Sequence, residues 1–425
     1  MNGTVVVGTL PRISVTRFAQ ILREARSPAA AEADACWRAV AAEGVDPLFA
    51  LAIFAHESRF GTVGLVAEHD LRNPGATRTS RTGAGQPVSV PGRGQFVRYP
   101  SWTEGFRDLA RRLVDPGFVY RRAGADTVEA IVPLWAPAAD GNDPASYIAA
   151  VRRFMAQHGE EPVPGVPLEI ALVPRGAPNR PAYPLRPAWI TVHETANEQP
   201  GADARAHQRF VHSGGGPEGV SFHFVVDDQR IVQLLPTTEN GWHAGDGAQG
   251  PGNRTSIAVE LCVNRDGDWS RTQEHGARLV AALCRAFGLP VERVVPHQNW
   301  SGKRCPRRLL EQGFEGFRQQ VAKILEGGEM ASDVVQIGPL GRHVGHGFLE
   351  FWRTLERIDP TLPLRTLGWP LTEEFEYAGA VYQVFERAVL KYGESEPEPW
   401  RVHVSLFGEA TRVVEWARSR GLLRS

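Results

Sequence analysis

Lysine and cysteine are both scarce in this chain of 425 residues, and each scarcity limits what the protein can be. Lysine occurs only at Lys303, Lys323 and Lys391, although lysine and arginine together number 47. The four cysteines show no close pairing pattern, which excludes a disulfide framework as the basis of the fold. A lysine and a cysteine that lie close together, at Lys303 and Cys305, therefore stand out.

Net charge and long apolar runs are also lacking. The formal net charge is −1, so no overall electrostatic attraction favours nucleic acid or an anionic membrane as a partner. No apolar run approaches the ~20 residues that cross a bilayer, so we expect no transmembrane segment. The opening MNGTVVVGTLPRISVTRF lacks a basic stretch followed by a long apolar one, so we expect no signal peptide. A substrate outside the cell would then require non-classical or lysis-dependent export, or an incomplete N-terminus.

A hydrophobic content of 42% and a charged content of 22% are typical of a soluble globular protein. Two segments have the composition of linkers: the proline-rich residues 158–187 and the short polar EGGEMASD at 326–333. They predict three domains, at residues 1–157, 188–326 and 334–425. We expect the proline-rich linker to let the first two domains fold independently.

The first segment has a helical pattern. VDPLFALAIFAHESRF places Asp46 as a helix N-cap and Pro47 in the first turn, followed by an apolar run that reaches Glu57. SWTEGFRDLARRLV has Ser101 and Glu104 at the spacing of a capping box, and PASYIAAVRRFMAQHG indicates a closing helix. These patterns predict an α-helical domain.

The second segment alternates between strands and helices. AWITVHET predicts a strand, FHFVVDDQRIVQLLP a hairpin and SIAVELCVN a buried strand, whereas RTQEHGARLVAALCRAFG predicts a helix that ends at Gly288. The alternation indicates a mixed α/β domain with a central sheet and flanking helices. The third segment has short aromatic stretches separated by turns, which predict a small accessory domain.

The stretch HQNWSGKRCP, residues 297–306, combines metal-ligand residue types with a cation. A catalytic zinc ion uses three protein ligands and keeps a fourth position open. His297 and Cys305 supply two candidate ligands, and His193, at the end of the expected strand AWITVH, is the best third. The alternative is that His297 is a polar loop residue and Cys305 a small buried hydrophobe.

Five motifs occur along the middle segment in the order WITVHET, VSFHFVVDD, GWHAGDG, NRTSIAVELCVN and HQNWSGKRCP. In this order they resemble the zinc-dependent N-acetylmuramoyl-L-alanine amidases of the amidase-2 group, across roughly residues 185–325. The resemblance implies one zinc ion per chain, held by His193, His297 and Cys305. It also implies cleavage of the amide between N-acetylmuramic acid and L-alanine in bacterial peptidoglycan.

The same resemblance implies two catalytic residues. Glu260, in IAVELC, matches the acidic position that moves the proton of the attacking water, and Lys303 matches the cation that stabilises the oxyanion. The alternatives are a buried ion pair for Glu260 and a solvated surface position for Lys303.

His223, Trp242 and His243 match positions near the substrate, although each histidine is equally consistent with a structural role. Some relatives carry a tyrosine where this chain has Phe222, which increases the importance of Glu260. Three other histidines have no supporting context, and we expect them on the surface: His207, His212 and His275.

The first segment contains FALAIFAHESRFGT, LRNPGATR, GQFVRYPSWTEGFRDLARRL and NDPASYIAAV. Across roughly residues 40–157 it resembles the glucosaminidase family of lysozyme-like glycosidases. The resemblance implies endo-β-N-acetylglucosaminidase activity with Glu57 as the acid, because glycosidic cleavage needs a protonated carboxyl group in apolar surroundings. No second carboxylate is evident, so the 2-acetamido group of the substrate could act as the nucleophile. Tyr147 is a further candidate for substrate binding. The alternative is that Glu57 ends a helix and pairs with Arg59 or another cation.

The last segment, LGWPLTEEFEYAGAVYQVFERAVLKY, resembles LGFP-type repeats, which accompany cell-wall proteins. Its aromatic residues could fill a small core or stack on sugars, and the core is favoured. Together the segments predict a multidomain peptidoglycan hydrolase that acts at the cell wall, and they indicate no oligomeric state. The alternatives are a non-catalytic peptidoglycan-binding protein and an amidase with a purely wall-binding first domain. The presence of Cys305, which non-catalytic relatives typically lose, favours an enzyme.

Overall fold

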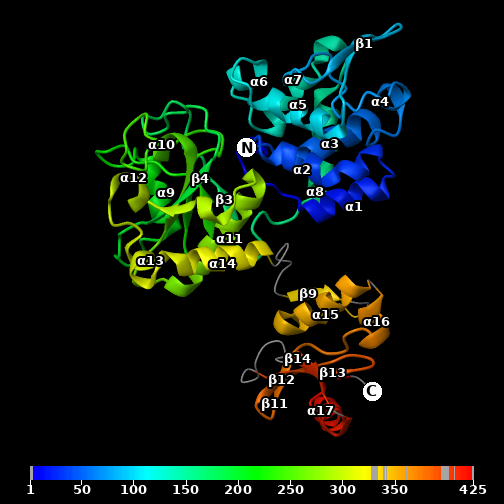
Figure 1. Ribbon diagram of the computed structural model, residues 1–425, viewed down its shortest axis with the longest axis vertical. Helices are drawn as coiled ribbons and strands as arrows, with labels where there is room; N and C mark the ends of the chain where they lie inside the picture. Colours follow the sequence, from blue (N-terminus) through cyan, green and yellow to red (C-terminus); the bar gives the residue numbers. More distant parts are fainter. Residues whose placement is uncertain are drawn as a thin grey trace. The chain divides into compact units, whose positions relative to one another are not determined.

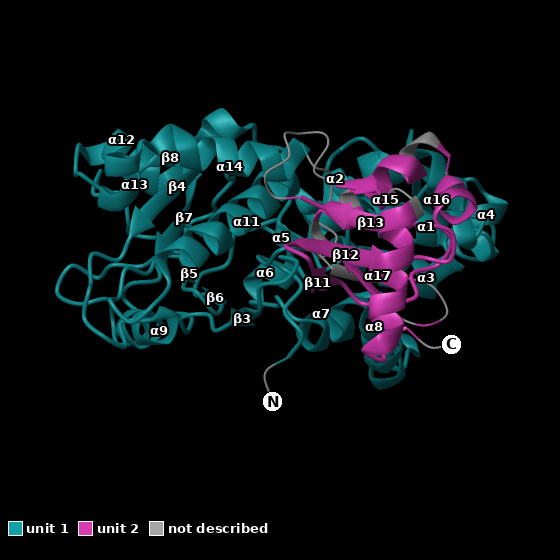
Figure 2. Ribbon diagram, turned by 90° about the horizontal axis from the view of Figure 1, so that it is seen from below, with its two compact units in different colours: residues 1–329 teal, residues 330–425 magenta. Residues whose placement is uncertain are grey.

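The computed structural model describes residues 3–326, 334–337, 340, 342–359, 361–393, 402–405 and 407–423. The chain divides into two compact units, residues 1–329 and 330–425 (Figures 1 and 2). The expected polar linker at 326–333 lies outside the described residues from residue 327 onward. Among the described residues, no helix is both long and apolar enough to cross a membrane.

The first half of the larger unit is helical, as its sequence predicts. It contains α1 (Val15–Glu24), α2 (Ala33–Ala41), α3 (Pro47–Ser58), α4 (Gly64–Glu68), α5 (Trp102–Val114), α6 (Val119–Arg122), α7 (Val128–Trp135), α8 (Pro144–His158) and one hairpin, β1 (Gln86–Val90) with β2 (Gly94–Arg98). The carboxylate of Asp46 accepts a hydrogen bond from the backbone N–H of Leu48, which begins α3 as expected. α3 is buried from Pro47 to Phe54, because apolar side chains occupy every face of that stretch.

The second half of the larger unit contains a six-stranded mixed sheet. The strands, in spatial order, are β3 (Leu168–Ile170), β6 (Ile231–Gln233), β5 (Phe224–Val226), β7 (Ser256–Leu261), β4 (Trp189–Glu194) and β8 (Val294–Pro296). β5 and β6 form the antiparallel hairpin expected from the sequence, and the other neighbours are parallel. The accompanying helices are α9 (Ala204–His212), α10 (Pro251–Thr255), α11 (Trp269–Phe287), α12 (Gln298–Ser301), α13 (Arg307–Gln312) and α14 (Phe314–Glu326). Gly288 ends α11 in the left-handed conformation, as predicted.

The register of this sheet brings candidate site residues together. β4 and β7 are parallel neighbours in which His193 is opposite Glu260. β8 pairs with the other side of β4 and ends at Pro296, so His297 follows immediately. The carboxyl ends of parallel strands meet at one edge of a sheet, which is where open α/β sheets place their ligand sites.

The proline-rich segment 158–187 contributes structure to the same unit. Its residues Leu168–Ile170 form the edge strand β3, and Val163 and Val173 are fully buried. Its prolines exclude a helix, but they leave room for an extended strand between them. The segment expected to separate two domains is therefore part of one compact unit.

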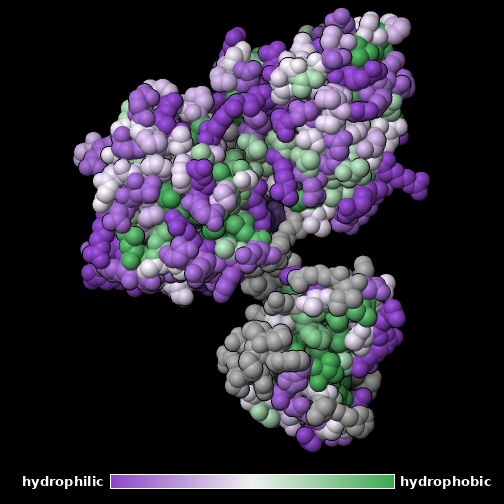
Figure 3. All heavy atoms as spheres, in the orientation of Figure 1, coloured by the Kyte–Doolittle hydropathy of each residue, from purple (hydrophilic) through white to green (hydrophobic). Residues whose placement is uncertain are grey.

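The smaller unit has its own core. It contains β9 (Val334–Ile337), β10 (Arg342–Gly345), α15 (His346–Ile358), α16 (Leu362–Thr366), β11 (Phe375–Tyr377), β12 (Ala380–Val384), β13 (Val389–Tyr392), β14 (Val402–Val404) and α17 (Phe407–Ser419). Trp352 and Phe385 are buried in this core with their rings stacked, as the core interpretation of the aromatic residues predicts. In the face shown in Figure 3, apolar residues gather in the middle of the visible part of this unit, beside hydrophilic residues, and both kinds occur on the larger unit.

Candidate metal and catalytic site

Three side chains with metal-binding atoms converge at the carboxyl edge of the large sheet. His193 is the second-last residue of β4, His297 follows β8 and Cys305 lies just before α13. Their candidate ligand atoms all lie within 4.8 Å of one another, and the three residues are buried. Among the described residues, this is the one group of at least three histidine, cysteine, aspartate or glutamate side chains arranged in this way. The structure therefore brings together the three residues predicted as metal ligands.

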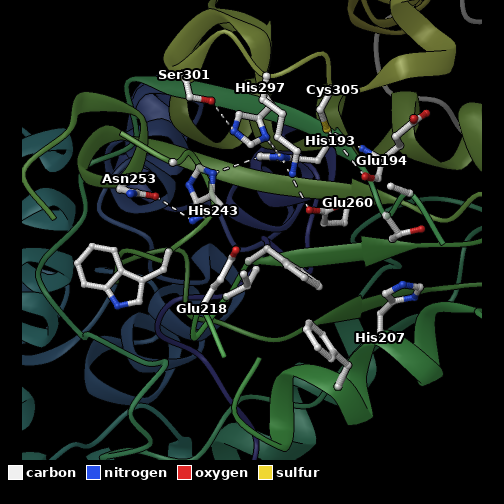
Figure 4. A pocket seen from close by; sticks show the side chains of 18 of the residues that line it. His193, Glu194, His207, Glu218, His243, Asn253, Glu260, His297, Ser301 and Cys305 are labelled. Atoms are coloured by element: carbon white, nitrogen blue, oxygen red, sulfur yellow. Dashed lines mark hydrogen bonds and ion pairs between the residues drawn. The ribbon is translucent and has the colours of Figure 1, made fainter. Parts of the chain in front are cut away.

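Hydrogen bonds behind the cluster orient its donor atoms (Figure 4). His297 Nε2 lies 2.9 Å from the carbonyl oxygen of Ala244, which can only accept, so Nε2 carries the proton and Nδ1 keeps a lone pair. His193 Nε2 lies 3.2 Å from Nδ1 of His243, and the backbone N–H of Glu194 donates to Cys305 Sγ at 3.5 Å. Partners of this kind fix the tautomer and orientation of metal ligands.

The charges of the cluster fit a bound cation. Burial lowers the pKa of both His193 and His297, which favours neutral rings with available lone pairs. Their Nδ1 atoms are 3.0 Å apart, and two lone pairs at that distance need a proton or a cation between them. Burial raises the pKa of the Cys305 thiol to about 12, with Glu260 adding to the effect, so a thiolate here depends on a nearby positive charge. Two imidazoles and one thiolate are a donor set that suits a divalent metal ion.

Glu260 lies beside this cluster on β7. Its Oε1 is 3.8 Å from His193 Nδ1, and its Oε2 is buried without a hydrogen-bond partner. Burial raises the pKa of Glu260 to about 8, although the nearby Lys303 opposes the shift. A buried carboxylate with an unpartnered oxygen is a suitable acceptor for a proton.

Lys303 lies on the loop that joins His297 to Cys305, and its side chain is exposed at the rim of the same cavity. Its ammonium group forms no ion pair with any side chain that the structure describes. The cation is therefore free to interact with negative charge that develops in the cavity.

The cavity in front of the cluster has a volume of about 1080 Å³. Trp242 and His243, the predicted substrate-binding residues, line it. So do Phe210, on α9, and Glu218, which follows α9 in the sequence; sequence reasoning missed both. His223 is absent from the lining because it is fully buried, and both of its ring nitrogens bond to backbone atoms of Glu239 and Ala258. The structure thus places His223 behind the cavity wall and not at the substrate.

The expectation that His207 and His275 lie on the surface is wrong. His207 and His275 are buried, with 9% and 5% of their surface exposed. His207 faces the cavity from α9, and His275 Nδ1 lies 3.0 Å from the carbonyl oxygen of Asp227. Both lie on the buried sides of amphipathic helices. The spacing of the apolar residues around them in the sequence could have indicated that they are buried. His212 is exposed, as predicted.

A second candidate site surrounds Glu57 near the end of α3. Glu57 Oε1 accepts hydrogen bonds from the Tyr147 hydroxyl at 2.7 Å and from Trp135 Nε1 at 3.0 Å. The ring of His56 stacks on Tyr147 with centroids 3.7 Å apart. The structure therefore brings Glu57 and Tyr147 together, and within the described ranges Glu57 has no ion pair with Arg59 or another cation. Trp135 was missed, because nothing in VPLW distinguishes it from a core aromatic residue.

Similarity to known proteins is found in the part of the chain that contains the candidate metal site. Residues 183–308 match the Amidase_2 family, described as N-acetylmuramoyl-L-alanine amidase. The match covers the middle segment and not the rest of the chain. The amidase domain is similar to N-acetylmuramoyl-L-alanine amidase CwlH of Bacillus subtilis (strain 168), with 50% identity over 139 residues, covering 33% of this chain and 55% of CwlH. It is also similar to the amidase XlyA of the same strain, with 42% identity over 197 residues, covering 45% of this chain and 63% of XlyA.

The alignments thus span little more than half of CwlH and less than two thirds of XlyA. A solved structure of the catalytic domain of XlyA aligns at 45% identity over 37% of this chain and 99% of that chain, with a TM-score of 0.35.

Proposed function

We propose that this protein is a peptidoglycan hydrolase whose amidase domain cleaves the bond between N-acetylmuramic acid and L-alanine at the bacterial cell wall. The observation that carries the proposal is the convergence of His193, His297 and Cys305 in a cavity that Glu260 and Lys303 also line. The printed names of CwlH and XlyA, both N-acetylmuramoyl-L-alanine amidases, support it.

In this proposal one zinc ion per chain is held by His193, His297 and Cys305. Three protein ligands from imidazole and thiolate are typical of catalytic zinc and leave a fourth position open. When bound, zinc supplies Lewis acidity toward water and toward the scissile carbonyl group.

The remaining steps belong to side chains of this chain. Glu260 takes the proton of the attacking water on its carboxylate and transfers it to the leaving amine of L-alanine, which its buried, unpartnered Oε2 favours. Lys303 stabilises the negative charge on the carbonyl oxygen, since its ammonium group is free at the cavity rim. Trp242 and His243 form part of the wall that holds the substrate.

Fragment analysis of purified peptidoglycan tests the amidase proposal. The unmodified protein should release peptides that begin with L-alanine, as detected by mass spectrometry. Glu260→Gln and Lys303→Ala should keep the metal and lose activity by roughly two to four orders of magnitude. Glu274→Gln and Lys323→Ala, which change the same residue types outside the cavity, should cleave at the unmodified rate. If the unmodified protein binds peptidoglycan but releases no peptide, the chain is a binding protein and the proposal fails.

We propose a second activity, cleavage of a β-1,4 bond of the glycan strand, with Glu57 as the general acid. The observation that favours it is the pair of donors, Tyr147 and Trp135, that both bind Oε1. With Oε1 occupied as an acceptor, a protonated Glu57 carries its proton on Oε2, where it can be given to the leaving oxygen. Tyr147 then orients the acid.

The two activities can be measured on one peptidoglycan preparation. Glu57→Gln should abolish new reducing sugar ends and leave peptide release intact, because it removes the acid without altering the metal ligands. Glu68→Gln, on the neighbouring helix α4, is the matched control. A chelator should have the opposite effect and stop peptide release alone. If the unmodified protein yields free amines but no new sugar ends, the first domain is a wall-binding module.

A further inference from the structure

A short segment of the amidase domain joins the helical domain to the cavity. Residues 236–244, PTTENGWHA, begin at the helical domain, where the backbone N–H of Thr237 donates to the carbonyl of Gly8 at 3.0 Å. A Cβ atom on Gly8 would lie 2.5 Å from Cβ of Pro236, so the two backbones meet without room for a side chain. At its other end, Trp242 and His243 line the cavity.

Glu239, in the middle of this segment, is held by a cation from the helical domain. Its carboxylate lies 2.6 Å from Arg121 Nη2 on α6 and 2.7 Å from Arg180 Nε. The side chain of Glu239 is fully buried, and that of Arg121 is 15% exposed. Burial acts to raise the pKa of Glu239, but the ion pairs with Arg180 and Arg121 outweigh it and lower the pKa. A buried carboxylate that loses one of its two cations is strongly disfavoured.

The backbone of Glu239 supports the histidines behind the metal ligands. Its carbonyl oxygen accepts a hydrogen bond from His223 Nε2 at 2.8 Å, and His223 Nδ1 accepts one from the N–H of Ala258 at 3.0 Å. Both partners are backbone groups of fixed polarity, so His223 has one tautomer and one orientation. Its ring packs edge-on against His243 with centroids 6.2 Å apart, and His243 contacts His193.

We infer that the helical domain sets the position of the cavity wall through Arg121, which is a positioning residue for Trp242 and His243. The ion pair with Glu239 holds the middle of segment 236–244, and the segment carries both wall residues. The inference rests on the proposed amidase function only for the identity of the substrate. Removal of the guanidinium loosens the segment around Glu239. His193, His297 and Cys305 do not lie on the segment, but His243 and Ala244 at its end contact His193 and His297.

Hydrogen–deuterium exchange on the full chain tests this inference without relying on catalysis. Arg121→Met keeps the length of the side chain but removes the charge, and Arg122→Met changes the exposed neighbour on the same helix. Amide exchange in residues 236–244 should be about tenfold faster in Arg121→Met, because local opening is easier there, and unchanged in Arg122→Met. Arg121→Lys should restore part of the protection.

Three further readouts separate positioning from general stability. Metal content should stay at the unmodified level in Arg121→Lys and Arg122→Met, and exchange in α8 and α11 should be unchanged in all variants. With peptidoglycan fragments as substrate, Arg121→Met should raise KM several-fold with little change in kcat. Unchanged exchange in 236–244, or an increase spread over the whole larger unit, would overturn the inference. If the unmodified protein releases no peptide, the proposed function fails, and the exchange data still decide the role of Arg121.

Discussion

At the residue scale, the candidate metal ligands could be predicted because each lies where sequence reasoning is strongest. His193 lies near the end of a mainly apolar strand, and His297 and Cys305 flank the scarce Lys303 within one loop. The contacts that orient them could not be predicted. The carbonyl of Ala244 and the ring of His243 lie on a loop at least fifty residues away in the sequence from the ligands that they contact, and no local sequence pattern indicates these contacts. The same reason explains why Trp135 was missed beside Glu57.

The ligand set gives a prediction for Cys305. In Cys305→Ser, zinc content measured by elemental analysis should fall from about one ion per chain to a small fraction, because a hydroxyl is a much weaker zinc ligand than a thiolate. Cys284→Ser is the control, since Cys284 is also buried but lies on α11 and belongs to no metal-binding group. Full zinc retention in Cys305→Ser would remove Cys305 from the site.

At the element scale, helices with clear caps and strands with apolar runs could be predicted, whereas the edge strand β3 could not. Asp46 and Pro47 mark the start of α3, and Gly288 marks the end of α11. β3 lies among prolines, which indicate a linker when read locally. It becomes a strand because β6 offers a parallel partner for Leu168–Ile170, and that partner is distant in sequence.

The N-cap of α3 gives a stability prediction, since this helix carries Glu57. Asp46 accepts from the N–H of Leu48 at 3.0 Å and pairs with Arg12 Nε at 2.8 Å while fully buried itself. Asp46→Ala should therefore destabilise the larger unit by about 2 kcal/mol, from the lost cap and the unpaired Arg12. Urea unfolding followed by circular dichroism should show a lower midpoint. Asp143→Ala, which removes the exposed cap of α8, should have a smaller effect. Equal midpoints for the two variants would contradict this account.

At the scale of the whole molecule, the sequence predicts three domains and the structure has two compact units. The difference lies in contacts between the N-terminal residues and the amidase domain. Leu10 is buried in the core of the sheet with Val163 and Val166, and Gln233 donates to the carbonyl of Gly8 at 2.6 Å. The residues in these contacts are more than 150 positions apart in the sequence, so composition alone could not reveal them. We therefore expect the helical and amidase domains to unfold together. These contacts argue against the independent folding that the proline-rich segment predicts.

The smaller unit leads to a prediction about truncation. Its core, built from residues such as Phe348, Trp352 and Leu390, is separate from the cores of the larger unit, so residues 1–329 should fold without it. The truncated chain should bind zinc and cleave soluble peptidoglycan fragments within about twofold of the full chain, because every proposed catalytic residue lies before residue 329.

Parallel assays on soluble fragments and on intact cell walls distinguish the roles open to residues 330–425. If the truncated chain loses activity on intact walls alone, the smaller unit is a wall-binding module. Anchoring raises the effective concentration of the enzyme at the wall, whereas cleavage of soluble fragments needs no anchoring. Equal rates on both substrates mean that it contributes to neither binding nor catalysis. A tenfold loss on soluble fragments would contradict the prediction, because it requires the smaller unit to complete the amidase site.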